Sequence, residues 1–232
     1  MSGEFRFTND WFANATEGRR RSPRESTSQL WDRLLTPMTP RPRRIIETGV
    51  CEGRSAFWFI KNLKPDLYVG VDPWRPDRRF HQEIYDTWRS NFFHNMAVVA
   101  GQPMVEESSH LFATTAGETR CVLVDLPSED YLRDGIDSDF PGQVFDLAYA
   151  DGEHSSLGAI TDFIMLWRKL APGGILIMDD FDRRYHNARP AVHEAVLAFW
   201  SIIEHNAHKI PITDATTSYE NKRQVWLRKR CN

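Results

Sequence analysis

The stretch IIETGVCEGRS (Ile45–Ser55) carries the pattern that decides the fold. Its first residues form a short apolar run that predicts a strand, and Gly49 and Gly53 follow where this strand ends and a helix begins. Glycine allows a backbone to approach a ligand closely, and open α/β sheets bind ligands at the carboxyl ends of their strands. The stretch therefore predicts a ligand-binding turn at the end of the first strand of an α/β sheet.

The sequence after this stretch alternates short apolar runs with amphipathic segments, which is typical of a mostly parallel sheet. Five parallel strands are predicted at residues 45–48, 67–71, 121–125, 145–150 and 175–179. Helices are predicted at residues 55–63, 157–170 and 192–203, and a hairpin at residues 208–213 and 224–228. We expect an α/β fold that is Rossmann-like and doubly wound, with a mostly parallel seven-stranded sheet, an antiparallel C-terminal hairpin strand and an N-terminal helical extension.

Residues 1–44 differ in composition from the rest of the chain and are rich in Arg, Pro and Ser. One helix is predicted there, because apolar residues recur at helical spacing behind Ser26, Thr27 and Ser28, which are residue types that cap helices well. We expect one domain, residues 1–232, in which this extension precedes a Rossmann-like core at residues 45–232. The candidate residues for a lid over a ligand are Asp10, Trp11 and Phe12.

The overall charge excludes some classes of partner. The chain has 29 Lys+Arg and 32 Asp+Glu, a formal net charge of -3, which gives no global field for binding nucleic acid or an anionic membrane. No run of about 20 apolar residues and no signal peptide is visible. The cysteines Cys51, Cys121 and Cys231 lack metal or redox spacing. We expect a cytoplasmic protein with no nucleic-acid or membrane partner, and the sequence is compatible with a homo-oligomer.

A second acid indicates what the turn binds. Asp72 ends the second predicted strand, where a carboxylate can accept two hydrogen bonds from a ribose diol. A dinucleotide site requires G-x-G-x-x-G beneath a pyrophosphate, but here Cys51 occupies the second glycine position and Glu52 adds a negative charge. S-adenosylmethionine has a ribose and an adenine, no phosphate, and cationic amino and sulfonium groups. The pattern favours this cofactor, and a tight strand-to-helix turn remains the alternative for the glycine spacing taken alone.

Three further acids follow the fourth and fifth predicted strands. Asp151 lies in YADGEH (149–154), and Asp179 and Asp180 lie in ILIMDDF (175–181). Carboxylates that converge at one sheet edge repel one another unless they are protonated or bind a cation, and oxygen ligands favour Mg²⁺ or Ca²⁺. We predict a divalent metal site at Asp151, Asp179 and Asp180, with helix capping and loop solvation as the alternative.

His154 is the predicted general base. It follows Asp151 by three residues, and an unperturbed imidazole has a pKa of about 6.5, which suits proton transfer near neutral pH. The alternative for His154 is a structural one, in which the imidazole caps the following helix or hydrogen-bonds Asp180.

Several motifs in order resemble one enzyme family. ETGVCEGRSAFW, GVDPW, FDLAYADGEHSSLGAITDF, LAPGGILIMDDF and QVWLRK, between Ile45 and Arg228, resemble the class I S-adenosylmethionine-dependent methyltransferases. The closest resemblance is to a small-molecule branch with an E-x-G-x-x-x-G-x-S loop and a D-G-x-H segment. The cofactor-binding residues that this resemblance and the residue positions imply are Glu47, Gly49, Gly53 and Ser55 in the loop, Asp72 at the ribose, Trp74, Asp125 and Ser128 near the adenine, and Asp151.

The acids are similar to those of metal-dependent O-methyltransferases of the catechol type and of some sugar methyltransferases of natural-product pathways. The resemblance implies a methyltransferase that acts on a hydroxyl of a small-molecule substrate, such as a sugar or natural product, with Mg²⁺ assistance and with His154 and Asp151 as catalytic residues. The alternatives are a metal-independent methyltransferase with His154 as base, a non-catalytic S-adenosylmethionine-binding module, and an NAD-dependent reductase.

Overall fold

The computed structural model describes residues 4–8, 26–76, 81–181, 191–210 and 224–231. Nine strands within these residues belong to a mixed α/β sheet with a mostly parallel core, so the predicted Rossmann-like fold class is confirmed. The chain divides into two compact units, residues 1–43 with 50–126 and residues 44–49 with 127–232, which are described separately. The candidate lid residues Asp10, Trp11 and Phe12 lie outside the described residues.

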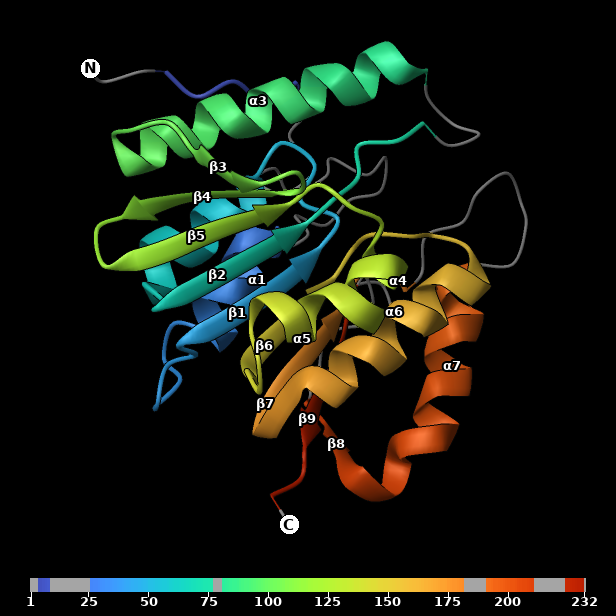
Figure 1. The fold of residues 1–232 in the computed structure, drawn as a ribbon. Coiled ribbons are helices and arrows are strands. Elements are labelled where there is room, and N and C mark those ends of the chain that lie inside the picture. Colours follow the sequence, from blue (N-terminus) through green and yellow to red (C-terminus); the bar gives the residue numbers. More distant parts are fainter. Residues whose placement is uncertain (1–3, 9–25, 77–80, 182–190, 211–223, 232) are drawn as a thin grey trace, which may run out of the picture. The chain divides into compact units, whose positions relative to one another are not determined.

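The strands of the first unit follow the order β3-β4-β5-β2. β2 (Leu67–Val71) runs parallel to β5 (Thr119–Val124), while β4 (Leu111–Ala116) is antiparallel to both β5 and β3 (Val105–Ser108). The long helix α3 (Gln82–Ala100) lies along these strands at the top of Figure 1. This unit therefore combines one parallel strand pair with an antiparallel hairpin.

The remaining helices of the first unit pack through aromatic side chains. α1 (Thr27–Leu34) begins at the predicted cap Ser26, whose hydroxyl accepts the N–H of Gln29. α2 (Arg54–Trp58) continues into a π-helical turn at Phe59–Leu63. The rings of Trp31 and Phe59 stack with centroids 4.5 Å apart, so α1 is fixed to the helix that follows the glycine turn.

The predicted count of seven strands is wrong, because the described residues already contain nine. The two additional strands are β3 and β4, which lie in the segment between α3 and β5. All four residues of β3 are exposed or half-buried, so this edge strand lacks an alternation of apolar and polar residues. β4 has the sequence LFATTA, in which small and hydroxyl residues dilute the apolar signal. A period-2 pattern is the main sequence signal for a half-buried strand, and neither segment shows it.

The strands of the second unit follow the order β1-β6-β7-β9-β8. β1 (Arg44–Thr48), β6 (Phe145–Ala150) and β7 (Leu170–Met178) are parallel. β9 (Val225–Lys229) is antiparallel to β7, and β8 (Ala207–Lys209) is antiparallel to β9, as the predicted hairpin requires. Hydrogen bonds link the carboxyl ends of neighbouring parallel strands. The N–H of Asp151, after β6, donates to the carbonyl of Thr48 in β1, and the N–H of Asp179, after β7, donates to the carbonyl of Ala150 in β6.

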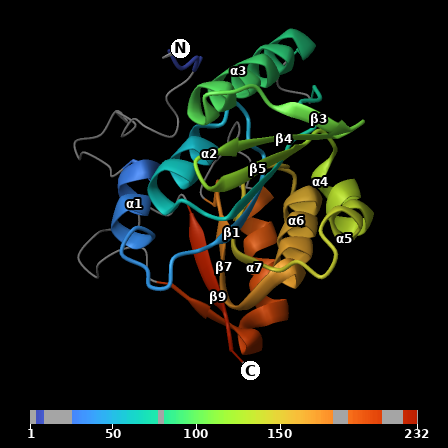
Figure 2. The same cartoon turned by 60° about the vertical axis from the view of Figure 1, so that its left-hand side comes forward.

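Two helices pack side by side in the second unit, α6 (Ser156–Lys169) and α7 (Ala191–Ile203) (Figures 1 and 2). The ring of Phe199 in α7 lies 5.8 Å from that of Phe163 and 5.9 Å from that of Trp167. Shorter helical segments are α4 (Ser128–Asp130), a π-helical turn (Tyr131–Gly135), α5 (Ile136–Asp139) and a 3₁₀ turn (Glu204–Asn206). In the described part of the chain, no helix is long and apolar enough to span a bilayer.

Candidate functional site

The turn after β1 is held by Asp72 and Trp74, which follow β2. The N–H of Cys51 donates to Oδ2 of Asp72 over 3.0 Å, and the N–H of Trp74 donates to Oδ1 over 2.8 Å. The indole Nε1 of Trp74 donates to the carbonyl of Cys51 over 3.0 Å. Burial raises the pKa of Asp72 to about 6, although these backbone donors lower it. The two residues predicted to meet the ribose and the adenine therefore also fix the shape of the glycine turn.

Both glycines of the turn have a left-handed backbone and close neighbours. Gly53 has a φ of 83°, and a Cβ at this position would lie 2.9 Å from the ring of Phe92. Gly49, in the second unit, also has a φ of 83°, and a Cβ there would lie 2.1 Å from the carbonyl oxygen of Asp151. Cys51 adopts a φ of 49°, which glycine tolerates better than cysteine. Glycine at positions 49 and 53 is thus required by the backbone itself.

Glu52, in the turn, has a buried side chain whose oxygens accept hydrogen bonds from Thr8 and Asn91. These donors are neutral and leave the carboxylate its negative charge. The charge of Glu52 and the side chain of Cys51 at the second glycine position both argue against a bound pyrophosphate.

Other predicted cofactor residues are found in defined local contacts. Asp125, after β5, forms an ion pair with Arg89 of α3, with 2.9 Å between Oδ2 and the guanidinium nitrogen. Ser128 donates to Oδ1 of Asp162 over 2.6 Å. Two further members of the predicted set are buried: Glu47 in β1 and Ser55 in α2. Each of these side chains is positioned by its own unit, and their role toward a cofactor stays a prediction.

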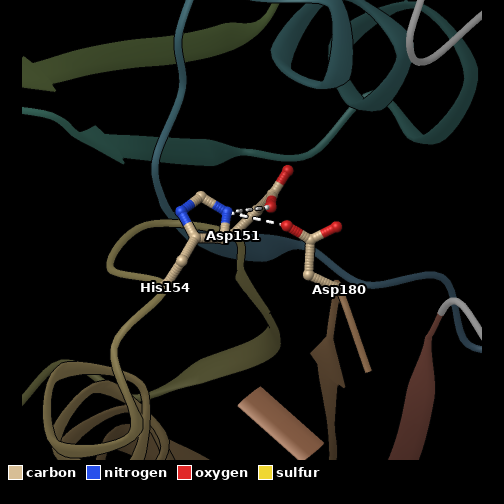
Figure 3. Close-up of side chains that lie close together, drawn as sticks. All are labelled: Asp151, His154 and Asp180. Carbon is tan, nitrogen blue, oxygen red and sulfur yellow. Dashed lines mark ion pairs between the residues drawn. The ribbon is translucent and has the colours of Figure 1, made fainter. Parts of the chain in front are cut away.

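Asp151, His154 and Asp180 form a close cluster at the ends of β6 and β7 (Figure 3). Nε2 of His154 lies 2.8 Å from Oδ2 of Asp180 and 3.6 Å from Oδ1 of Asp151. Burial lowers the pKa of His154, but hydrogen bonds and charges from Asp151 and Asp180 outweigh burial and raise the pKa to about 9. The imidazole is therefore protonated at neutral pH when only these two carboxylates face it.

Asp179, a predicted metal ligand, points to other partners. Its Oδ2 accepts from the phenol of Tyr149 over 2.5 Å and from Nε2 of Gln224 over 3.1 Å. Its Oδ1 accepts the N–H of Asp180 over 2.7 Å. Burial and the neighbouring acids Asp151 and Asp179 raise the pKa of Tyr149 well above its ordinary value, so the phenol remains a donor. The carboxylates of Asp151 and Asp180 therefore face His154, whereas the carboxylate of Asp179 bonds the backbone N–H of Asp180.

The sequence argument missed three residues next to this cluster. Tyr149 and Gln224 bond to Asp179, and Asp162 lines the same small pocket as His154 and Asp180. Burial raises the pKa of Asp162 to about 6. Asp162 had a visible signal, because it is an acid on the apolar face of α6 next to Phe163. Tyr149 and Gln224 had none, since the residue that both of them bond, Asp179, is distant from each of them in the sequence.

Comparison with known proteins defines the family. The family described as methyltransferase domain matches residues 46–181, which is more than half of the chain, and the chain belongs to this family. The prediction of a class I S-adenosylmethionine-dependent methyltransferase is thereby confirmed. No curated protein sequence matches the chain.

Solved structures share the fold at low sequence identity. An O-methyltransferase from Bacillus cereus in complex with SAH is 15% identical with a TM-score of 0.54, and the match covers 88% of this chain and 79% of that one. The O-methyltransferase TomG from Streptomyces achromogenes, involved in tomaymycin synthesis and solved with SAM, is 16% identical with a TM-score of 0.50 and coverages of 88% and 78%. The methyltransferase MycE of the mycinamycin pathway, with Mg, SAH and mycinamycin VI, is 16% identical with a TM-score of 0.53 and coverages of 86% and 48%.

Proposed function

We propose that this protein transfers the methyl group of S-adenosylmethionine to a hydroxyl of a small molecule, such as a sugar or another natural product, with a divalent cation bound at the acidic cluster. The observation that carries the proposal is the convergence of the Asp151 and Asp180 carboxylates on one ring nitrogen of His154. A protonated imidazole lies between the two carboxylates, and a divalent cation could provide the positive charge that its proton provides.

The donor set fits a divalent metal ion. One ligand atom from each of Asp151, His154 and Asp180 can be chosen so that all lie within 4.8 Å of one another. Carboxylate oxygens suit Mg²⁺, so Asp151 and Asp180 would hold the ion, and Nε2 of His154 would serve as the proton acceptor rather than as a ligand. Asp179 was predicted as a third carboxylate ligand, and in this proposal it orients Asp180 through the N–H of that residue. A bound cation would lower the pKa of an acceptor hydroxyl and fix its direction.

The chain's own residues supply alignment and proton transfer. Methyl transfer is an in-line displacement, so the rate depends on how well the acceptor oxygen is oriented toward the methyl group. Asp151 and Asp180 hold a proton on His154 while no cation is bound. A cation on the two carboxylates would offset their charge, favour the neutral imidazole and let Nε2 accept the proton that the acceptor hydroxyl releases. His154 and Asp151 are therefore the proposed catalytic residues.

For the cofactor we propose the residues that the sequence indicated. Asp72 would bind the ribose, since each of its oxygens accepts one backbone N–H and retains a further lone pair. Gly49 and Gly53 would admit the methionine part, together with Glu47, Ser55 and Asp151. Trp74, Asp125 and Ser128 would border the adenine. The SAH and SAM complexes of proteins with this fold support the choice of cofactor.

One set of measurements tests the proposal. Calorimetric titration with SAH and, separately, with Mg²⁺ would be followed by methyl transfer from labelled S-adenosylmethionine to a panel of sugars and polyketide alcohols, with and without EDTA. We expect SAH binding, heat on Mg²⁺ addition and transfer that EDTA abolishes. Transfer that survives EDTA, with no heat from Mg²⁺, would leave the metal-independent mechanism with His154 as base. Cofactor binding without transfer to any acceptor would favour a binding module.

The substrate proposal has support beyond this cluster. MycE, which has the same fold, was solved with Mg, SAH and mycinamycin VI. The cytoplasmic location and the homo-oligomer stay predictions of the sequence.

A further inference from the structure

The N-terminal residues 4–8 are bound to α3 along their backbone, and Figure 1 shows this segment beside the helix. The N–H of Arg6 donates to Oδ1 of Asn95 over 2.7 Å, and Nδ2 of Asn95 donates back to the carbonyl of Arg6 over 2.8 Å. The imidazole Nε2 of His94 lies 2.9 Å from the carbonyl oxygen of Glu4. The amide of Asn95 thus pairs with the segment as a neighbouring strand would.

The same segment reaches the glycine turn through Glu52. The N–H of Thr8 lies 3.0 Å from both carboxylate oxygens of Glu52, and the hydroxyl of Thr8 donates to Oε1 over 2.7 Å. The indole Nε1 of Trp88 donates to the Thr8 hydroxyl over 3.2 Å, which orients that hydroxyl toward the carboxylate. Thr8 therefore contributes two donors to one buried acid.

α3 completes the environment of Glu52. Nδ2 of Asn91 donates to Oε1 over 2.8 Å, and Nδ2 of Asn95 donates to the backbone carbonyl of Glu52 over 2.9 Å. Asn95 therefore bonds to the segment and to the turn with the same amide group. Beyond the turn, the guanidinium of Arg54 lies over the ring of Phe7, 3.9 Å from its centroid. The segment consequently contacts both neighbours of Gly53, Glu52 in the turn and Arg54 at the start of α2.

The burial of Glu52 makes these donors important. Its relative exposure is 2%, and a buried carboxylate is stable only with hydrogen-bond donors or a counter-charge. The donors from Thr8 and Asn91 are neutral, so the charge is compensated by several hydrogen bonds together. Loss of the Thr8 donors would favour movement of Glu52 toward water. Because Cys51 and Gly53 flank Glu52 in the turn, such a movement would change the backbone that Asp72 and Trp74 hold.

We propose that Glu52 is a positioning residue that couples residues 4–8 to the cofactor turn, so that the docked N-terminal segment raises the affinity for S-adenosylmethionine. Glu52 touches no reacting atom, and it acts through the conformation of Cys51 and Gly53. The inference rests on the proposed function, because it takes this turn as the cofactor site.

Variants of the full chain test the coupling. Thr8→Val removes the hydroxyl donor, and Glu52→Gln removes the charge while keeping the shape. Loss of a hydrogen bond to a buried charge typically corresponds to about a tenfold or larger change in an equilibrium constant. We expect both variants to weaken SAH binding at least about fivefold by calorimetry, with a higher KM for S-adenosylmethionine and an unchanged kcat. Thr87→Val, which makes the same change at an exposed position of α3 whose hydroxyl donates to Glu83, should bind SAH within about twofold of the unaltered chain.

Amide hydrogen exchange gives a readout that is independent of activity. Coupling is reciprocal, so SAH should slow exchange at the amides of Arg6 and Thr8 in the unaltered chain and should do so less in Thr8→Val. If Glu52→Gln does not fold, as its thermal unfolding would show, Thr8→Val and the exchange data decide the question. SAH affinity unchanged in Thr8→Val, with no effect of SAH on the two amides, would overturn the inference and leave the proposed function standing. Failure of the unaltered chain to bind SAH would overturn both.

Discussion

Nε2 of His154 lies 2.8 Å from Oδ2 of Asp180, and this contact joins the loop after β6 to the end of β7. Asp180 holds a left-handed backbone conformation, with a φ of 56°, that directs its side chain to the imidazole. Such a conformation is uncommon for residues other than glycine and costs about 1 to 2 kcal/mol. Strained residues are frequent at functional sites, which agrees with a role for Asp180 in binding.

The first prediction concerns metal binding by this pair. Asp180→Asn should weaken binding of Mg²⁺ or Mn²⁺ by at least about tenfold, because it removes one of the two carboxylates that face His154. Calorimetry with Mg²⁺ and the EPR signal of free Mn²⁺ measure this directly. Asp130→Asn is the matched control, since Asp130 is an exposed acid in the same unit that pairs with Arg133. Equal cation affinity in Asp180→Asn and the unaltered chain would contradict a metal site at Asp180.

The second prediction concerns the pH dependence of stability. Burial raises the pKa of Asp162 from 3.8 to about 6, so the folded state binds this proton more tightly than the unfolded state. The stability contribution is full below the unfolded pKa and is lost as the pH rises through about 6, a loss of roughly 3 kcal/mol. Asp162→Asn keeps an acceptor for Ser128 and avoids this loss.

We therefore expect Asp162→Asn to match the unaltered chain in unfolding free energy near pH 4 and to exceed it increasingly toward pH 7. Urea unfolding of the cofactor-free protein at several pH values measures the difference. If the difference in unfolding free energy between the two proteins stays constant across this pH range, Asp162 has the same pKa in the folded and unfolded states.

The third prediction concerns cofactor affinity. Only the ionised form of Asp72 can accept hydrogen bonds from both ribose hydroxyls with both of its oxygens, and its pKa is raised to about 6 by burial. SAH affinity should therefore fall by up to about tenfold for each unit below that pH. Asp72→Asn should lower the affinity at pH 7.5 and flatten this pH dependence in calorimetric titrations. Asp66→Asn, which changes an exposed acid paired with Arg43 in the same unit, should leave the profile intact.

The fourth prediction separates backbone strain from steric overlap. Gly49 and Gly142 both have a positive φ, 83° and 66°. A Cβ at Gly49 would clash with the carbonyl oxygen of Asp151, whereas a Cβ at Gly142 would have no atom within 4 Å. Gly142→Ala should cost about 1 to 2 kcal/mol for the left-handed backbone alone. Gly49→Ala should cost more than about 3 kcal/mol, because overpacking adds its own penalty. Equal shifts of the unfolding midpoint in the two variants would show that β1 and the Asp151 loop can move apart freely.

Part of the fold was readable because particular residues carry a strong local signal. The observed bounds of β2 and β6 coincide with the predicted ones, since both are short, mostly apolar runs that an aspartate follows. The cap at Ser26 was visible among three candidates, because a side chain that bonds three residues ahead is a local interaction. β3 was missed because an exposed edge strand is stabilised by its partner rather than by its own pattern. β4, which lies between β3 and β5, was missed because its small and hydroxyl residues dilute the apolar signal.

The candidate site divides in the same way. The positions of strand ends and of glycines can be read from the order of residues. The sequence by itself therefore determined that Gly49, Asp72, Asp151 and Asp180 lie at the carboxyl ends of strands in a methyltransferase fold. The direction of each side chain depends on partners distant in the sequence. Only the tertiary structure decided that Asp179 turns to Gln224, that His154 meets Asp180, and that Glu52 faces Thr8. The physical reason is that a buried charge points to whichever donors the packed chain provides, and those donors come from segments that local sequence cannot identify.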